Sequence, residues 1–221
     1  MNSVERLEEI RSKIPSNIKV VAVSKTKPAT MVEDLYSNAG HRIFGENRVQ
    51  ELEAKHFILP HDIEWHLIGH LQTNKVKFVV PYIGMIQSVD SFRLLHEINS
   101  EALKKNRIIP CLLQFHIAEE DSKFGFSLEE ACAMLDNELI YQFKNVEIKG
   151  VMGIATYTTE LTKIRSEFKA LYSTFDYLRK TYFSSAQGFS EVSMGMTNDY
   201  MLAVEEGSTI LRIGSGIFGE R

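Results

Sequence analysis

The sequence predicts a single (β/α)₈ barrel, and two features of the chain carry this prediction. Eight short apolar segments alternate with helical segments, and such alternation indicates βαβ units that build a parallel sheet. The apolar segments are nearly continuous, as expected for strands that are covered on both faces. Eight such units in 221 residues lie near the short end of the size range of these barrels. An open, doubly wound sheet is the structural alternative.

The eight expected strands are short apolar runs bounded by polar or turn-forming residues. They are residues 20–24, 43–45, 64–68, 85–89, 108–117, 148–155, 190–193 and 209–213. No linker rich in Pro, Gly or Ser and no low-complexity tract interrupts the series. We therefore expect one domain over residues 1–221.

An extra helix is expected before the first strand. Residues 2–14 place apolar side chains on one helical face, Asn2 and Glu5 form a capping pair, and Pro15 ends the helix. The same helical spacing predicts helices over 91–105 and 160–180.

Composition and charge exclude several classes of protein. Lys and Arg number 25 and Asp and Glu number 29, so the net charge is −4, and the absence of a basic run argues against nucleic-acid binding. No segment approaches the roughly 20 apolar residues that cross a bilayer, and the first ten residues lack an apolar signal segment. Cys111 and Cys132 are too few for a disulfide scaffold. We expect a cytoplasmic protein that does not bind membranes.

A lysine stands where the first strand ends. Lys25 directly follows the segment VVAVS, and barrel active sites lie at the carboxyl ends of the strands. A lysine at this rim is expected to be partly desolvated, which favours the neutral amine that attacks carbonyl carbons and forms Schiff bases. The alternative is an ordinary solvated lysine at a strand end.

Two loops near the carboxyl end of the sequence have the residue types of an anion site. Gly214, Gly216 and Gly219 spell GxGxxG around Ser215, but the helix and acidic residue of a dinucleotide-binding unit do not follow. The loop 193–199 after the seventh strand also combines Ser, Thr and Gly. In barrels, phosphate is often bound by backbone N–H groups and hydroxyls of the loops after the seventh and eighth strands, here called loops 7 and 8. The alternative is an ordinary turn that closes the barrel.

The histidine pair invites a metal interpretation that its context does not support. His66 and His70 are four residues apart, but the glutamate of an HExxH motif is missing and Gly69 interrupts the segment. We expect no metal site. No GxSxG motif indicates a serine hydrolase, and no spacing selects a pair of catalytic carboxylates.

Seven motifs together resemble the YggS/PROSC family of pyridoxal phosphate homeostasis proteins. They are VAVSKTKP at 21–28, FGENRVQEL at 44–52, WHLIGHLQTNK at 65–75, SVDS at 88–91, MGIA at 152–155, SMGMTNDY at 193–200 and RIGSGIFGER at 212–221. The motifs are spread over nearly the whole chain. The resemblance implies a barrel like the N-terminal domain of alanine racemase and the cofactor pyridoxal 5′-phosphate (PLP).

The resemblance also implies roles for individual residues. Lys25 is expected to hold PLP covalently as a Schiff base, the internal aldimine. Ser193, Gly214 and Ser215 are expected to bind the phosphate, and the Ser215 hydroxyl fits the Ser or Thr that is usual in the family. Arg212 is expected to face the pyridine nitrogen.

Two further residues, Asn47 and His66, lie in family motifs near the cofactor, and the resemblance gives neither a defined role. Position 48 is Arg where the family often has Tyr, and this difference is not expected to disturb the cofactor.

The residue opposite the pyridine nitrogen bears on catalysis. A guanidinium only donates hydrogen bonds, so the nitrogen that faces Arg212 must accept and stay unprotonated, which makes the ring a weak electron sink. This favours weak catalysis or none. The resemblance implies a PLP carrier, expected to be a monomer, that serves PLP homeostasis and supplies PLP-dependent apoenzymes.

Two enzyme functions stay open as alternatives. The first is an amino-acid racemase of the alanine racemase type. It needs a second base, which alanine racemase takes from a tyrosine of another domain. The barrel is expected to occupy all of this chain, so a tyrosine within it, such as Tyr157, would have to substitute. The second is an aldolase-like enzyme with a Schiff-base lysine and a phosphorylated sugar substrate.

Overall fold

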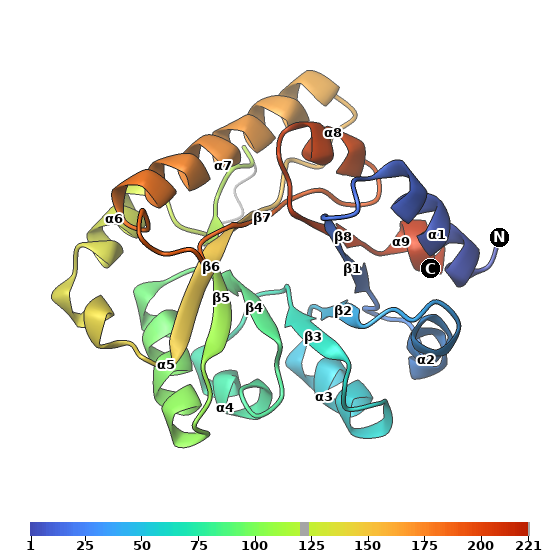
Figure 1. The fold of residues 1–221 in the computed structure, drawn as a ribbon, viewed down its shortest axis with the longest axis horizontal. Helices are drawn as coiled ribbons and strands as arrows, with labels where there is room; N and C mark the ends of the chain where they lie inside the picture. The colour runs from blue at the N-terminus through green and yellow to red at the C-terminus, as the bar shows by residue number, and fades with distance from the viewer. Residues whose placement is uncertain (120–123, 221) are drawn as a thin grey trace.

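The computed structural model describes residues 1–119 and 124–220, and within them eight parallel strands close into a barrel (Figure 1). Each strand pairs with its neighbours in chain order, and β8 pairs with β1 to complete the ring. The strands are β1 (Lys19–Val23), β2 (Ile43–Glu46), β3 (Glu64–Leu67), β4 (Met85–Val89), β5 (Ile109–Phe115), β6 (Val146–Gly153), β7 (Glu191–Ser193) and β8 (Ile210–Ile213). The closed ring confirms the barrel and shows that the open-sheet alternative is wrong.

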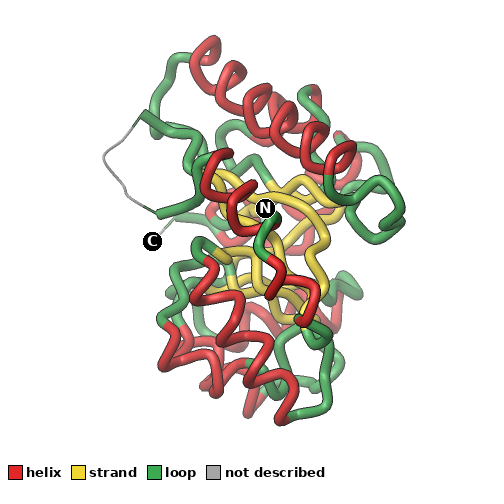
Figure 2. The backbone as a smooth tube through the Cα atoms, turned by 90° about the vertical axis from the view of Figure 1, so that its left-hand side faces the viewer, coloured by secondary structure: helices red, strands yellow, loops and turns green. Residues whose placement is uncertain are grey.

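Helices surround the ring of strands, as the red and yellow tubes of Figure 2 show. The α-helices are α1 (Ser3–Lys13), α2 (Ala29–Asn38), α3 (Val49–Ile58), α4 (Val76–Val79), α5 (Phe92–Lys104), α6 (Leu128–Leu135), α7 (Leu161–Thr181), α8 (Tyr200–Glu205) and α9 (Ser215–Phe218). Two 3₁₀ helices, η1 (Thr73–Lys75) and η2 (Glu138–Gln142), precede α4 and β6. None of these described helices is long and apolar enough to span a bilayer.

The expected extra helix is α1, and its start follows the capping pattern in the sequence. The Asn2 side chain accepts a hydrogen bond from the Glu5 N–H at 2.8 Å, and the Glu5 carboxylate accepts one from the Asn2 N–H at 3.0 Å. The helix lies beside α9, so the first and last elements of the fold are neighbours (Figure 1).

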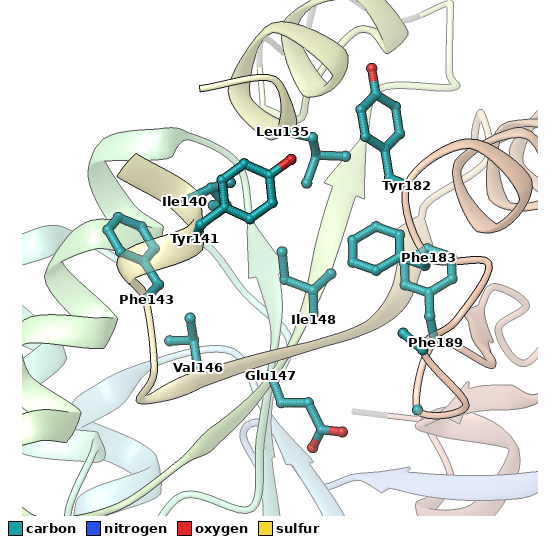
Figure 3. A pocket seen from close by; sticks show the side chains of 12 residues that line it. Leu135, Ile140, Tyr141, Phe143, Val146, Glu147, Ile148, Tyr182, Phe183 and Phe189 are labelled. Carbon is teal, nitrogen blue, oxygen red and sulfur yellow. The ribbon is translucent and has the colours of Figure 1, made fainter. Parts of the chain in front are cut away.

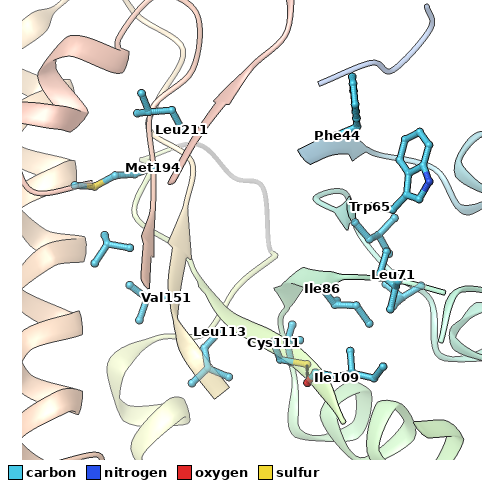
Figure 4. Close-up of a cluster of buried hydrophobic side chains, with 14 of the residues drawn as sticks. Phe44, Trp65, Leu71, Ile86, Ile109, Cys111, Leu113, Val151, Met194 and Leu211 are labelled. Atoms are coloured by element: carbon cyan, nitrogen blue, oxygen red, sulfur yellow. Dashed lines mark hydrogen bonds between the residues drawn. The ribbon is translucent and has the colours of Figure 1, made fainter. Parts of the chain in front are cut away.

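The main hydrophobic core lies between the strands and the surrounding helices. Side chains alternate across each strand, and the outward-facing set packs against the helical layer. Trp65 and Phe44 are among the largest side chains that are fully buried there. Figure 4 shows part of this cluster around Phe44, Trp65, Ile86, Leu113 and Leu211.

The lumen of the barrel has a smaller apolar layer and a polar one. The apolar layer is a separate buried cluster made of Val21, Met85, Leu112, Met152 and Ile210. The buried polar side chains Gln87, His66, Ser193 and Arg212 also come from barrel strands. The lumen is therefore a packed interior, and its carboxyl-terminal part is polar.

Strand β6 begins two residues earlier than the sequence predicts, and its pairing is irregular at one glycine. The register between β5 and β6 shifts where Leu112 pairs with Gly150. Gly150 has φ +155°, and a Cβ there would lie 1.8 Å from the Glu191 carbonyl oxygen. Only glycine allows this approach of β6 to β7.

We predict that Gly150→Ala lowers the free energy of unfolding by about 3 kcal/mol or more, because the new Cβ cannot fit against backbone. Gly40→Ala is the matched control, since Gly40 also has positive φ (+59°) but nothing lies within 4 Å of its Cβ position. Its expected loss is about 1 kcal/mol. Urea unfolding at neutral pH measures both, and equal losses would show that close backbone approach does not constrain position 150.

Candidate functional site

A cavity of about 770 Å³ opens at the carboxyl ends of the strands, the rim at which the sequence places the active site. Five of the seven predicted site residues line it, and the other two, Ser193 and His66, do not. The full lining is Val23, Lys25, Asn47, Ile68, Ile154, Thr156, Tyr157, Thr158, Thr159, Leu161, Ile164, Met196, Thr197, Asn198, Asp199, Arg212, Gly214 and Ser215.

Lys25 brings a free amine to this cavity. Among the described residues its Nζ has no hydrogen-bond or ion-pair partner. The neighbouring Lys27 differs, because its Nζ donates to the carbonyl oxygens of Gly219 and Glu220 at 2.9 Å each. Lys25 is exposed, so the predicted partial desolvation of its side chain is wrong. The reason is that Lys25 stands on the turn above the rim and not within the strand.

A buried ionic network holds the turn that carries Lys25. Lys55 on α3 donates to the Glu46 carboxylate at 2.6 Å, to Glu51 at 2.9 Å and to the Ser24 carbonyl oxygen at 2.7 Å. The Ser24 hydroxyl donates to the same Glu46 oxygen at 2.6 Å, and Glu51 accepts the Thr26 N–H at 2.5 Å. Thr26 has φ +63°, an unfavourable conformation that this bond stabilises. The network therefore fixes the backbone on both sides of Lys25.

Arg212 lies on the side of the cavity that faces the lumen. Its guanidinium is buried, and it donates to the Ser193 hydroxyl at 2.6 Å and to the Gly153 carbonyl oxygen at 2.8 Å. Burial lowers the pKa of Arg212 to about 10, while the nearby Asp199 acts in the opposite direction. The guanidinium therefore stays charged at neutral pH, and N–H groups beyond these two bonds are available to a ligand.

Loops 7 and 8 meet at the cavity wall through two hydroxyls. Thr197 Oγ1 accepts from the Gly216 N–H at 3.1 Å and lies 3.3 Å from the Ser215 hydroxyl. Gly216 permits this contact, because a Cβ there would lie 3.0 Å from the Thr197 methyl group. Asp199 shapes loop 7 by accepting the Met196 N–H at 2.5 Å. The predicted anion loops thus come together.

Thr197 is a residue that the sequence reasoning missed. The sequence predicted loop 193–199 as an anion loop without giving Thr197 a role, and the resemblance assigned the phosphate to Ser193, which ends β7. Thr197 lies four residues after Ser193 and within the loop itself, and this position could have indicated that its hydroxyl reaches the cavity.

Asn47 presents a buried polar group at the cavity. Its Oδ1 is buried and has no partner among the described residues, and its side chain lines the cavity. Gly69 permits the close approach of its backbone to that of Asn47, because a Cβ at position 69 would lie 2.3 Å from the Asn47 carbonyl oxygen. A buried acceptor without a donor is costly, so a ligand that donates a hydrogen bond here would stabilise the site.

The two predicted residues that miss the cavity lie in the lumen. Ser193 and His66 are fully buried, and both are hydrogen-bonded to Gln87. His70 is separate from His66 and pairs with Asp90 at 2.9 Å. Residues 1–119 and 124–220 hold no group of three His, Cys, Asp or Glu side chains that suits a metal ion.

A second cavity, of about 420 Å³, differs in chemistry and place (Figure 3). Aromatic and aliphatic side chains around the start of β6 and the end of α7 form most of its wall, including Phe143, Ile148, Phe183 and Phe189. Its lining includes the carboxylate of Glu147 and no cation. The first cavity is therefore the candidate for an anionic, carbonyl-bearing ligand.

Comparison with known proteins places the chain in a family. The family model described as alanine racemase, N-terminal domain, matches residues 3–221. The pyridoxal phosphate homeostasis protein of Aquifex aeolicus is 35% identical over 232 residues, covering 100% of this chain and 99% of the relative. The chain belongs to the family of pyridoxal phosphate homeostasis proteins. The human member is 37% identical, and the alignment covers 98% of this chain and 83% of that one.

Solved structures agree with this membership. PipY of Synechococcus elongatus PCC7942, solved with PLP bound, is 34% identical, with a TM-score of 0.88 over 99% of this chain and 100% of that one. Alanine racemase of Clostridium difficile 630 is 13% identical with a TM-score of 0.76, and 57% of its chain is covered. The second likeness shows a shared barrel fold and nothing about activity. Of the family motifs, only the last residue, Arg221, lies outside the described residues.

We predict that Lys55→Met lowers the free energy of unfolding by about 3–5 kcal/mol at neutral pH, because it leaves Glu46 buried without its cation. Burial raises the pKa of Glu46, and the bonds from Lys55 and Ser24 counteract the rise. Without Lys55 the pKa rises further. In the variant, the pKa of the Glu46 carboxyl is higher in the folded protein than in the unfolded chain, where it is about 4.3. The contribution of such a carboxyl to the free energy of unfolding is fully present below the unfolded pKa and is lost as the pH rises through the folded pKa.

The loss of stability should therefore be larger at about pH 8 than at about pH 5, as measured by denaturant unfolding at both values. Lys13→Met is the control, since Lys13 forms an exposed pair with Glu9 and its removal should leave stability nearly unchanged. A loss for Lys55→Met that is the same at both pH values would contradict the assignment of Glu46 as the group left unpaired.

Proposed function

We propose that this protein binds PLP in the rim cavity and serves PLP homeostasis as a carrier without strong catalytic activity. The observation that carries the proposal is the meeting, in one cavity, of the unpaired Lys25 amine with the buried Arg212 guanidinium and the hydroxyl-bearing loops 7 and 8. The relatives named for PLP homeostasis and the PLP-bound PipY structure support it.

The residues present fit this cofactor. When bound, PLP supplies an aldehyde that condenses with a primary amine, a pyridine ring and a phosphate dianion. Lys25 would provide the amine, Arg212 would donate to the pyridine nitrogen, and Thr197, Gly214 and Ser215, which line the same cavity, would bind the phosphate. The unsatisfied Asn47 Oδ1 accepts a hydrogen bond from the ligand or from a water that comes with it.

The proposed carrier role extends to the whole chain. We propose that residues 1–221 act as one PLP-binding domain, as a monomer in the cytoplasm, and that PLP-dependent apoenzymes receive the cofactor. Retention by Lys25 keeps the aldehyde from reacting with other amines until transfer.

Racemisation is the second candidate function, and the position of Tyr157 favours it. Tyr157 lines the same cavity as Lys25, and its side chain is 86% exposed. Against it stands Arg212, whose charged guanidinium keeps the pyridine nitrogen unprotonated and so weakens stabilisation of a carbanion.

The test of the proposal is the attachment point of the cofactor. Purified protein incubated with PLP should develop a visible absorption band, and borohydride followed by peptide mapping should find the cofactor on Lys25. Lys25→Ala should lose the band and keep the fold. Lys27→Ala is the control and should keep both, because Lys27 is bonded to carbonyl oxygens. Labelling of any other lysine in the wild-type chain would refute the assignment.

The phosphate site gives a quantitative expectation. Ser215→Ala and Thr197→Val each remove a donor to a dianion, a bond worth about 1.5–3 kcal/mol, so each should weaken PLP binding by roughly 10- to 150-fold. Fluorescence titration measures this effect. Pyridoxal, which lacks the phosphate, is the control ligand: it should bind more weakly than PLP and be insensitive to both substitutions. Equal affinity for PLP and pyridoxal would place the phosphate elsewhere.

Proton exchange separates the carrier from the racemase. With L-alanine in D₂O, the PLP-loaded protein should give α-deuteration no faster than free PLP and no D-isomer, as measured by NMR and chiral chromatography. Turnover of about 1 s⁻¹ or faster, in the range of enzymes, would establish the racemase. If such turnover fell in Tyr157→Phe, Tyr157 would be its second base.

A further inference from the structure

A chain of hydrogen bonds crosses the barrel lumen below the cofactor cavity. Arg212 Nη1 donates to Ser193 Oγ at 2.6 Å, and Ser193 Oγ donates to Gln87 Oε1 at 2.7 Å. Gln87 Nε2 lies 2.8 Å from His66 Nδ1. His66 Nε2 lies 2.9 Å from a carboxylate oxygen of Glu64, at the opposite end of the barrel from the cavity.

In the structure the Gln87 amide has Oε1 toward Ser193 and Nε2 toward His66, and with this orientation donation along the hydrogen bonds runs in one direction. The Ser193 hydroxyl has a single proton, and because it accepts from Arg212 it gives that proton to Gln87 Oε1. The Gln87 amide then presents its NH₂ group to His66, so Nδ1 must accept. His66 is thereby fixed as the tautomer with its proton on Nε2, which donates to Glu64.

Because these side chains are buried, each hydrogen bond depends on the residue beside it in the series. Ser193, Gln87 and His66 have no exposed surface, so water cannot replace a lost partner. The hydrogen bond from His66 lowers the pKa of Glu64, with Lys19 adding to the effect, so the far end of the chain holds a carboxylate. Four strands, β3, β4, β7 and β8, contribute the members.

We infer that Gln87 and His66 are positioning residues for Arg212. Gln87 and His66 orient the Ser193 hydroxyl so that its lone pair points toward Arg212. Ser193 and the Gly153 carbonyl oxygen then orient the guanidinium so that another of its N–H groups faces the ligand. The inference rests on the proposed function, in which that N–H donates to the pyridine nitrogen of PLP. It also gives Ser193 and His66, which lie outside the cavity, a connection to the site.

The tautomer can be tested without cofactor. In apo protein labelled with ¹⁵N-histidine, the ring nitrogens of His66 should give the NMR pattern of the neutral Nε2–H tautomer, and Gln87→Leu should abolish the hydrogen-bond shift at Nδ1. His66→Gln identifies the signals. A wild-type His66 protonated on Nδ1 would overturn the proposed direction of donation.

The effect on the site is tested with PLP labelled with ¹⁵N in the ring. In the wild type, the ring nitrogen should show the shift of an unprotonated, hydrogen-bonded pyridine, and Gln87→Leu should move it toward the value of an unbonded pyridine. PLP binding should weaken roughly 3- to 10-fold, part of the effect of a full hydrogen bond to a charged group. Gln114→Leu is the matched control, because it makes the same change on β5 at a residue that is not part of the hydrogen-bonded series from Arg212 to Glu64. It should alter neither the ring-nitrogen shift nor the PLP affinity.

Gln87→Glu keeps the test decisive if Gln87→Leu folds poorly, and a double variant tests whether Arg212 transmits the effect of Gln87. Gln87→Glu still accepts from Ser193 and pairs with a protonated His66, so it should retain the wild-type ring-nitrogen shift. In an Arg212→Met background, Gln87→Leu should change PLP affinity by less than about 2-fold, because Arg212 transmits its effect.

The outcomes separate the inference from the proposed function. If PLP in the wild type shows no hydrogen bond at the ring nitrogen, or Arg212→Met leaves that signal unchanged, the assigned role of Arg212 fails. If Arg212→Met removes the hydrogen bond but Gln87→Leu leaves it intact, the role of Arg212 stands and the positioning role of Gln87 is refuted.

Discussion

Closure of the barrel by pairing of β8 with β1 is the constraint on which the site depends. Val21 pairs with Arg212 in this register, so the two ends of the sequence become adjacent strands. Parallel strands present all their carboxyl ends at one rim. Lys25, which follows β1, and the loop that follows β8 therefore share a cavity although nearly the whole sequence separates them. Without the pairing of β8 with β1, a sheet in this strand order would leave the two strands on opposite edges.

The structure places two buried polar assemblies beside this cavity. One is the ionic network of Lys55 and Glu46 behind the Lys25 turn, and the other is the chain from Arg212 to Glu64 in the lumen. Buried polar groups are costly unless every one finds a partner. In each assembly most polar groups are hydrogen-bonded to other members. The first fixes the turn that carries the Lys25 amine, and the second orients the Arg212 guanidinium.

The fold alone does not choose between a carrier and an enzyme. Alanine racemase shares the barrel at 13% identity, and function resides in the side chains that a barrel presents. In the proposed function the decisive group is Arg212, because a charged donor opposite the pyridine nitrogen of PLP would limit how far the ring can accept electrons. On that proposal the barrel would suit retention of a reactive aldehyde better than demanding chemistry on it.

The sequence by itself determined the places of the eight strands along the chain, the capped helix α1 and the position of Lys25 after the first strand, because periodicity and capping are local properties. It also indicated the small-residue loops at the cavity. Only the tertiary structure decided which polar residues reach that cavity. Ser193 and His66 point into the lumen and Thr197 lines the wall, because side-chain direction depends on strand register and barrel closure. The partners of Lys55 and Gln87 likewise come from distant segments, and no pattern within a short stretch of sequence records such pairings.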